Sequence, residues 1–206
     1  MSTSVAPATT DRADFRTIVV GGTRLGILTV AAVALFLAVS RFVPGLLARR
    51  FLETLIVLVT AVAASFLPAR WTAARRADGI AGAAATGLVG TVVFSVADVT
   101  LRQILPFKPY PWTWLAVGGG SNWWWLPLWW VLGTFAAWMG AYVTAGQAAR
   151  GEPTLTRCAA PVIVGALIIG TVARLAGAAL PLPVQAGAAF AVSLAGFAVA
   201  ALVRTR

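Results

Sequence analysis

Charged residues are sparse in this chain, and they divide the sequence into long uncharged runs. These runs cover residues 25–40, 54–69, 79–97, 109–149, 158–173 and 175–203, with lengths of 16, 16, 19, 41, 16 and 29 residues. A helix needs about 20 mainly apolar residues to cross the hydrocarbon core of a bilayer. Charged side chains that flank the shorter runs can extend to the interface, which restores that length. The pattern therefore predicts helices that cross a membrane.

The composition supports this prediction. Of the 206 residues, 60% are hydrophobic and 11% are charged, and the mean hydropathy is +0.88. These values exclude a soluble globular domain, a disordered tail and a coiled coil. We expect an all-α fold, a polytopic integral membrane bundle of about six transmembrane helices.

Prolines, glycines and charges set the expected helix boundaries. The six helices are expected at about Thr23–Phe42, Phe51–Leu67, Gly79–Leu101, Trp124–Ala145, Arg157–Leu180 and Val184–Val203. Residues 1–16 are expected to form a flexible tail, and 17–206 a single transmembrane domain with an aromatic-rich loop at 102–123. Between the second and third helices, residues 69–78 are expected to form an interfacial turn that Trp71 and anionic lipid anchor.

The distribution of basic residues predicts the orientation. With six spans, the side that holds both termini carries ten of the 16 Lys and Arg residues, and the other side carries six. Basic residues accumulate on the cytoplasmic side of a membrane. We therefore expect a multi-pass protein of a bacterial cytoplasmic membrane with both termini in the cytoplasm. The basic residues are scattered among apolar runs, so we expect contact with lipid headgroups and no binding of nucleic acid.

Residue types that are rare or absent limit the chemistry. The chain has no histidine, one cysteine and six acidic residues. It therefore lacks the general base of a Ser-His-Asp or Cys-His site and the ligands of His-coordinated metals or haem. Cys158 alone cannot form a disulfide within the chain, and we expect it to be a small buried apolar residue. We predict no catalytic, cofactor or metal site.

Tryptophans are concentrated in one segment, with seven of the nine lying within 19 residues. They are Trp112, Trp114, Trp123, Trp124, Trp125, Trp129 and Trp130. Indole rings prefer the headgroup level of a bilayer, so the segment is typical of an interfacial or re-entrant loop. Two other interpretations stay open. The segment could dock a protein or lipid, or it could line a pocket for a flat or cationic solute.

Four ionisable residues fall within or close to the expected spans: Glu53, Asp98, Arg102 and Arg174. In a six-helix topology, all four approach the side that also holds the tryptophans. Charge inside a span is costly and needs a partner. We predict that Arg174 pairs with Asp98 or Glu53, either to lock helices together or to form a vestibule that binds a solute or a proton.

Small residues recur at helical spacing in four of the expected helices. The stripes are Gly82, Thr86 and Gly90; Gly87, Thr91 and Ser95; Gly133, Ala136, Gly140 and Thr144; Gly165, Gly170, Ala173 and Gly177; and Gly196 and Ala200. Helices in a membrane associate through close packing, which small residues permit. Each stripe therefore predicts packing within the bundle or an interface with a partner.

These features favour a non-catalytic accessory or structural subunit of a larger membrane complex. The alternative is a small-solute-binding protein or transporter subunit. In length and topology, the chain resembles the substrate-binding subunits of energy-coupling-factor vitamin importers. This resemblance implies a solute-binding role, but the chain shares no motif with those subunits. A membrane enzyme would have to work through Glu53, Asp98 and Arg174 alone. We expect lipid and other membrane subunits as partners, with no cofactor.

Overall fold

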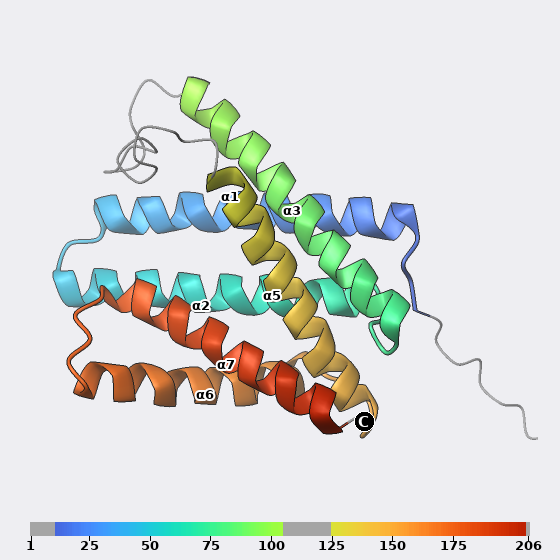
Figure 1. The fold of residues 1–206 in the computed structure, drawn as a ribbon. Coiled ribbons are helices and arrows are strands. Elements are labelled where there is room, and N and C mark those ends of the chain that lie inside the picture. Colours follow the sequence, from blue (N-terminus) through green and yellow to red (C-terminus); the bar gives the residue numbers. More distant parts are fainter. Residues whose placement is uncertain (1–10, 105–124, 205–206) are drawn as a thin grey trace, which may run out of the picture.

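The fold is described here from a computed structural model, which covers residues 11–104 and 125–204 (Figure 1). The helices are α1 (Phe15–Phe42), α2 (Leu46–Trp71), α3 (Ala77–Ile104), α5 (Trp125–Ala148), α6 (Leu155–Leu175) and α7 (Leu182–Arg204). All six helices in these ranges are long and apolar enough to cross a membrane, and the ranges contain no strand. The all-α, multi-pass membrane fold expected from the sequence is confirmed.

Helix α2 is the centre of the bundle. It contacts each of the other five helices in the described ranges, whereas α6 packs mainly on α7. In Figure 1, α1, α2 and α6 run nearly parallel, and α3, α5 and α7 cross them obliquely. Helix α1 begins and helix α7 ends on the same side of the bundle, and we call this side the terminal end. It also holds the α2–α3 and α5–α6 connections. The opposite end holds the α1–α2 and α6–α7 connections.

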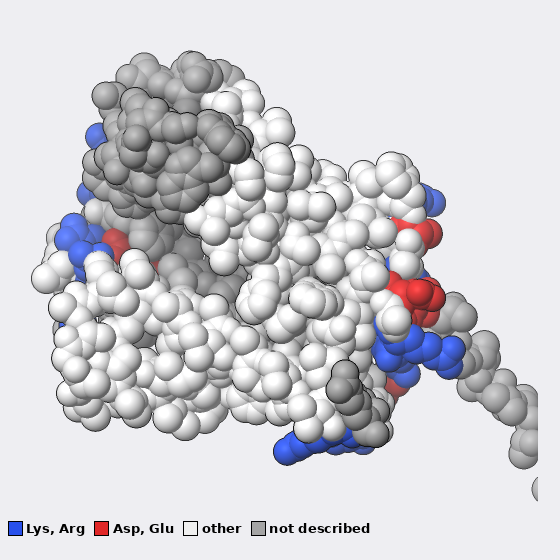
Figure 2. All heavy atoms as spheres, in the orientation of Figure 1, with Lys and Arg blue, Asp and Glu red and all other residues white. Residues whose placement is uncertain are grey.

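Charge and apolar surface are separated as a bilayer requires. On the face shown in Figure 2, charged side chains gather at the two ends, and the surface between them is free of charge. Large apolar side chains are exposed on the helices between their ends, for example Leu35 on α1, Val131 on α5 and Ile168 on α6. Lipid chains can cover such side chains without cost, since lipid is as apolar as they are.

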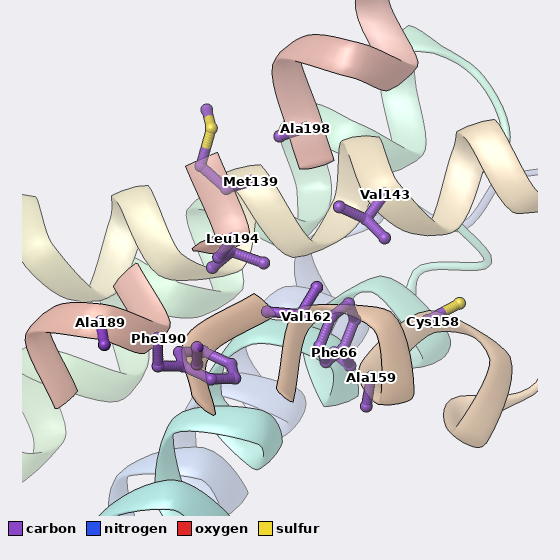
Figure 3. Packing of buried hydrophobic residues seen from close by; sticks show 11 residues of the cluster. Phe66, Met139, Val143, Cys158, Ala159, Val162, Ala189, Phe190, Leu194 and Ala198 are labelled. Atoms are coloured by element: carbon purple, nitrogen blue, oxygen red, sulfur yellow. The ribbon is translucent and has the colours of Figure 1, made fainter. Parts of the chain in front are cut away.

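A buried cluster holds α2, α5, α6 and α7 together (Figure 3). Phe66 of α2 lies among Val143 of α5, Val162 of α6 and Phe190 of α7. Cys158 belongs to this cluster and is only 3% exposed, which confirms its predicted burial. Aliphatic side chains, two phenylalanine rings and the sulfur-bearing Met139 and Cys158 fill the cluster, so its packing density depends on how closely the helix backbones approach.

Glycines of the predicted stripes lie where helices cross. A Cβ added to Gly140 would collide with the backbone carbonyl of Ser65 on α2. A Cβ added to Gly87 on α3 would lie 2.5 Å from the carbonyl oxygen of Gly133 on α5. These stripes therefore pack within the bundle. The stripe on α7 differs, because nothing lies within 4 Å of a Cβ added to Gly196.

Helix α1 begins eight residues earlier than expected, so the last two residues of the predicted 1–16 tail are helical. The side chain of Asp14 is the N-cap: it accepts hydrogen bonds from the backbone N–H of Thr17 at 3.1 Å and from its hydroxyl at 2.6 Å. An N-cap carboxylate satisfies N–H groups that have no partner inside the helix. Residues 1–10 of the predicted tail lie outside the described residues.

Two other predicted boundaries are corrected. Helix α2 continues through Pro68 to Trp71. A proline removes one hydrogen bond from a helix, but a helix in a membrane tolerates this loss because neighbouring helices can supply other partners. Helix α6 ends at Leu175 and not at Leu180. Gly177 has a φ of +90° there, and its N–H bonds to the carbonyl of Arg174, which completes a Schellman turn with Ala178.

Candidate functional site

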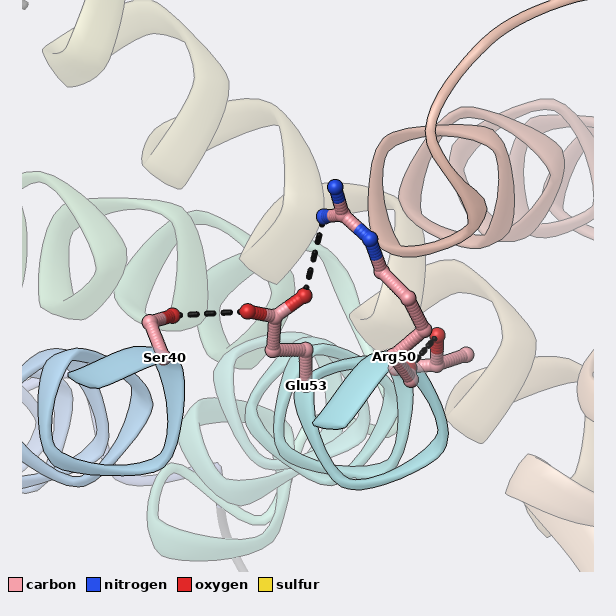
Figure 4. A network of polar contacts seen from close by, with 4 residues as sticks. Ser40, Arg50 and Glu53 are labelled. Carbon is pink, nitrogen blue, oxygen red and sulfur yellow. Dashed lines mark hydrogen bonds and ion pairs between the residues drawn. The ribbon is translucent and has the colours of Figure 1, made fainter. Parts of the chain in front are cut away.

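A buried carboxylate occupies the opposite end of the bundle, next to the α1–α2 connection (Figure 4). Glu53 is 3% exposed. One of its oxygens accepts a hydrogen bond of 2.7 Å from the hydroxyl of Ser40, and the other accepts one of 3.0 Å from the guanidinium of Arg50. The carboxylate thus joins the last turn of α1 to the first turns of α2.

The short spacing within this group explains why Glu53 can remain buried. Arg50 precedes it by three residues on the same face of α2, so the ion pair forms without any tertiary constraint. Ser40 satisfies the second oxygen from a different helix. A buried charge is tolerated only when it is paired and hydrogen-bonded, and both conditions hold here. This arrangement acts as a clamp between two helices.

Arg174 lies in the last turn of α6, where its exposed guanidinium donates to the carbonyls of Ala178 at 3.3 Å and Leu180 at 3.1 Å. No ion pair joins Arg174 to Glu53 among the described residues, so the predicted pairing with Glu53 is wrong. The predicted pairing with Asp98 stays a prediction. Glu53 is satisfied by its own helix and by α1. The turn at Gly177 brings the following loop back within reach of Arg174, so loop carbonyls take the place of a carboxylate.

Arg50 and Arg174 line one cavity, although they do not share a partner. Its volume is about 760 Å³, and its other walls are Leu46, Leu47 and residues 177–182 of the α6–α7 connection. The walls are mainly apolar, with the two guanidiniums as the charged groups. Such a cavity could accept a small anion with an apolar part.

The remaining predicted charges lie on α3. Asp98 is buried, with 9% exposure, and Arg102 follows one turn later in the same helix. Helix α3 ends on the same side of the bundle as the α1–α2 and α6–α7 connections (Figure 1), and Asp98, Glu53 and Arg174 belong to the helix segments next to that side. Nothing is described of the side chain of Arg102. Glu53 and Arg174 thus lie at one end of the bundle, but each has its own partners and they form no ion pair with each other.

Most of the predicted tryptophan site falls outside the described residues. This applies to Trp112, Trp114, Trp123 and Trp124, and to the side chain of Trp125 at the start of α5. Trp130 is half-buried, and its indole N–H lies 3.4 Å from the hydroxyl oxygen of Ser95 on α3. Trp129 is 40% exposed. The indole of Trp130 thus faces α3 inside the bundle, whereas the neighbouring Trp129 lies on the surface of α5.

Sequence reasoning missed a contact at the terminal end. The carboxylate of Asp11 accepts backbone N–H groups of Arg76 and Gly79, both at 2.9 Å, and so caps α3 from 65 to 68 positions away in the chain. The N–H of Arg12 donates to the carbonyl of Thr72 at 2.8 Å. Asp14 ahead of an apolar run is a local signal for the start of α1. The contact of Asp11 with α3 has no such signal, because it joins residues that are far apart in the sequence.

The residues that the structure describes include no group of three Cys, Asp or Glu side chains that could hold a metal ion. No family model, curated protein or solved structure matches this chain. Its function must therefore be inferred from its own geometry.

Proposed function

We propose that the protein is a non-catalytic structural subunit of a larger membrane complex and that it binds its partner through α7. The supporting observation is the outward-facing small-residue stripe of this helix. Ala188, Gly196 and Ala200 are spaced by multiples of four residues, so they share one face, and all three are exposed; the larger Val192 lies on the same face. No atom lies within 4 Å of a Cβ added to Gly196. Small residues on a lipid-facing surface let a second helix approach closely.

Close packing between α2 and α5 favours this proposal over transport. At the Gly140–Ser65 crossing, the backbones of α5 and α2 are in direct contact, which leaves no room for a solute. Buried hydroxyls such as those of Ser65, Thr86 and Thr144 donate to carbonyls of their own helices. Their hydroxyl hydrogens are therefore already used within their own helices and are not free to bind a solute.

The alternative function, binding of a small solute, is favoured by one observation. The cavity lined by Arg50 and Arg174 is large enough for a metabolite-sized anion. It lies at one end of the bundle, whereas transporters that act alone bind their solutes near the middle of the membrane. A subunit that binds a solute and delivers it to other subunits would also contact a partner helix. The α7 variant therefore tests a contact that both functions require.

The test is the native mass of the protein after mild solubilisation. The wild-type chain should migrate with a stoichiometric membrane partner, and the Gly196→Ile variant should migrate alone. Because no other helix lies within 4 Å of a Cβ added to Gly196, this variant should keep the wild-type melting midpoint. The matched control is Ala31→Ile, which enlarges an exposed small residue on α1 and should leave the complex intact.

Two outcomes would refute the proposal: a wild-type chain that migrates as a lone monomer, or a Gly196→Ile variant that retains the partner. A wild-type monomer whose melting midpoint rises with a particular metabolite would support the solute-binding alternative. The proposed cytoplasmic location of both termini has its own test. A C-terminal alkaline phosphatase fusion should be inactive, and a C-terminal fluorescent protein fusion should be bright.

A further inference from the structure

Four arginines line one cavity at the terminal end of the bundle. The cavity has a volume of about 630 Å³ and lies between the start of α1 and the end of α2. Arg12, Arg16 and Arg24 come from the N-terminal segment and α1, and Arg70 comes from the last turn of α2. The indole of Trp71 forms part of the wall.

None of the four arginines of this cavity forms a close ion pair within the part of the chain that the structure describes, although the Asp14 carboxylate attracts Arg16 and Arg12 at longer range. The ion pairs found there, Arg50–Glu53 and Arg75–Glu152, involve other residues. Asp14 is the one acidic residue in the cavity wall, and its carboxylate is engaged by Thr17 as the cap of α1. The cavity therefore concentrates positive charge, and guanidinium groups match the geometry of phosphate oxygens.

Tertiary contacts hold the cavity walls in place. The cap that Asp11 provides to α3 and the hydrogen bond from Arg12 to Thr72 fix the segment that carries the first two arginines. On the other wall, the indole of Trp71 packs over Gly21, with ring carbon Cε3 3.2 Å from the position of an added Cβ. The site is therefore preorganised, which lowers the entropic cost of binding.

The position of the cavity relative to the bilayer indicates a lipid. Helix α1 has 28 residues, so it is about 42 Å long, against a hydrocarbon core of about 30 Å. Its first turns can therefore lie at headgroup depth. The exposed side chains of Val20, Ile27, Leu28 and Leu35 continue along α1 from the cavity. They provide an apolar surface for an acyl chain directly beside the basic site.

We propose that the cavity formed by Arg12, Arg16, Arg24, Arg70 and Trp71 binds the phosphate headgroup of an anionic phospholipid. The arginines contact the phosphate oxygens, and the lipid chain lies along α1. Free inorganic phosphate has the same charge-bearing group but would gain nothing from the apolar surface. This inference does not depend on the proposed role of α7.

The experiment follows the melting midpoint of delipidated protein in a neutral detergent, with a thiol-reactive dye that reports exposure of Cys158. Phosphatidylglycerol should raise the midpoint in a saturable way, whereas phosphatidylcholine and inorganic phosphate should not. Arg24→Gln and Arg70→Gln, alone and together, should weaken the apparent affinity for phosphatidylglycerol by about tenfold or more. Both side chains are exposed, so the variants should melt like the wild-type protein when lipid is absent.

The matched control is Arg157→Gln, which removes one exposed charge at the same end but outside the cavity. It should bind phosphatidylglycerol as the wild-type chain does. An equal loss of affinity in this control would show unspecific attraction to charge and would overturn the proposal. An equal stabilisation by inorganic phosphate would identify a free anion as the ligand. Stabilisation by none of the three additives would also overturn it.

Discussion

The contact between Gly140 and Ser65 predicts a large loss of stability for the smallest possible substitution, Gly140→Ala. The new methyl group would lie well inside van der Waals distance of the Ser65 carbonyl oxygen. That oxygen belongs to a buried helical backbone and cannot rotate away, so α5 would have to move off α2 by roughly an ångström. A gap of this size forfeits about a quarter to a half of each affected dispersion contact.

The contacts that would loosen are those of the buried cluster around Phe66, Met139 and Val143, which lie next to this crossing in sequence. Overpacked sites cost about 1–3 kcal/mol, and a contact between two backbones belongs at the upper end of this range. We therefore expect a loss of about 3 kcal/mol in the free energy of unfolding, which corresponds to a roughly hundredfold larger unfolding constant.

The assay is unfolding in mixed micelles, followed by reaction of the single buried thiol of Cys158 with a fluorogenic dye. Gly196→Ala is the matched control. Its methyl group would meet nothing within 4 Å, and alanine favours a helix over glycine by about 1 kcal/mol. The control should be neutral or slightly stabilising. Equal stabilities of the two variants would refute the close backbone contact between α2 and α5.

Three further predictions concern the helix ends. Ala73 has a φ of +49° at the turn after α2, so Ala73→Gly should raise the free energy of unfolding by about 1 kcal/mol in the same assay. Glu53→Gln removes the ion pair with Arg50 and should lower the free energy of unfolding by about 1–2 kcal/mol. An unchanged free energy of unfolding would show that the contact between Glu53, Arg50 and Ser40 contributes nothing to stability. Hydrogen bonds from the hydroxyl and then the N–H of Thr17 lower the pKa of Asp14 below its usual value. The stabilisation by this cap should therefore be complete above the pKa of the unfolded carboxyl group, about 3.9, and should disappear as the pH falls through the lower folded value. Asp14→Asn should flatten this part of the acid titration.

The number and type of the helices in residues 11–104 and 125–204 could be predicted from the sequence because both depend on local properties. Uncharged runs of sufficient length must become helices in lipid, where every backbone polar group needs an internal partner. The helix ends were less predictable. Pro68 is compatible with the interior of α2 because of its surroundings, and Gly177 ends α6 because of the turn that it adopts.

The site could be predicted only in part. The sequence marks Glu53 and Arg174 as charges that need partners, but it does not identify those partners. Arg50 is close to Glu53 along the helix, whereas the partner of Asp11 lies more than 60 residues away. A charge pairs with the group that the folded backbone brings nearest, and in this bundle that is often a carbonyl or a neighbouring turn.

Apolar length and sparse charge are properties of each segment, so the amino-acid sequence is enough to predict that this chain crosses a membrane through helices. Which faces of those helices are occupied depends on the folded bundle. Gly140 and Gly196 stand in similar stripes of small residues, yet one touches a backbone carbonyl and the other faces outward. The difference arises because packing depends on how all the helices cross, and no local pattern encodes the crossing geometry.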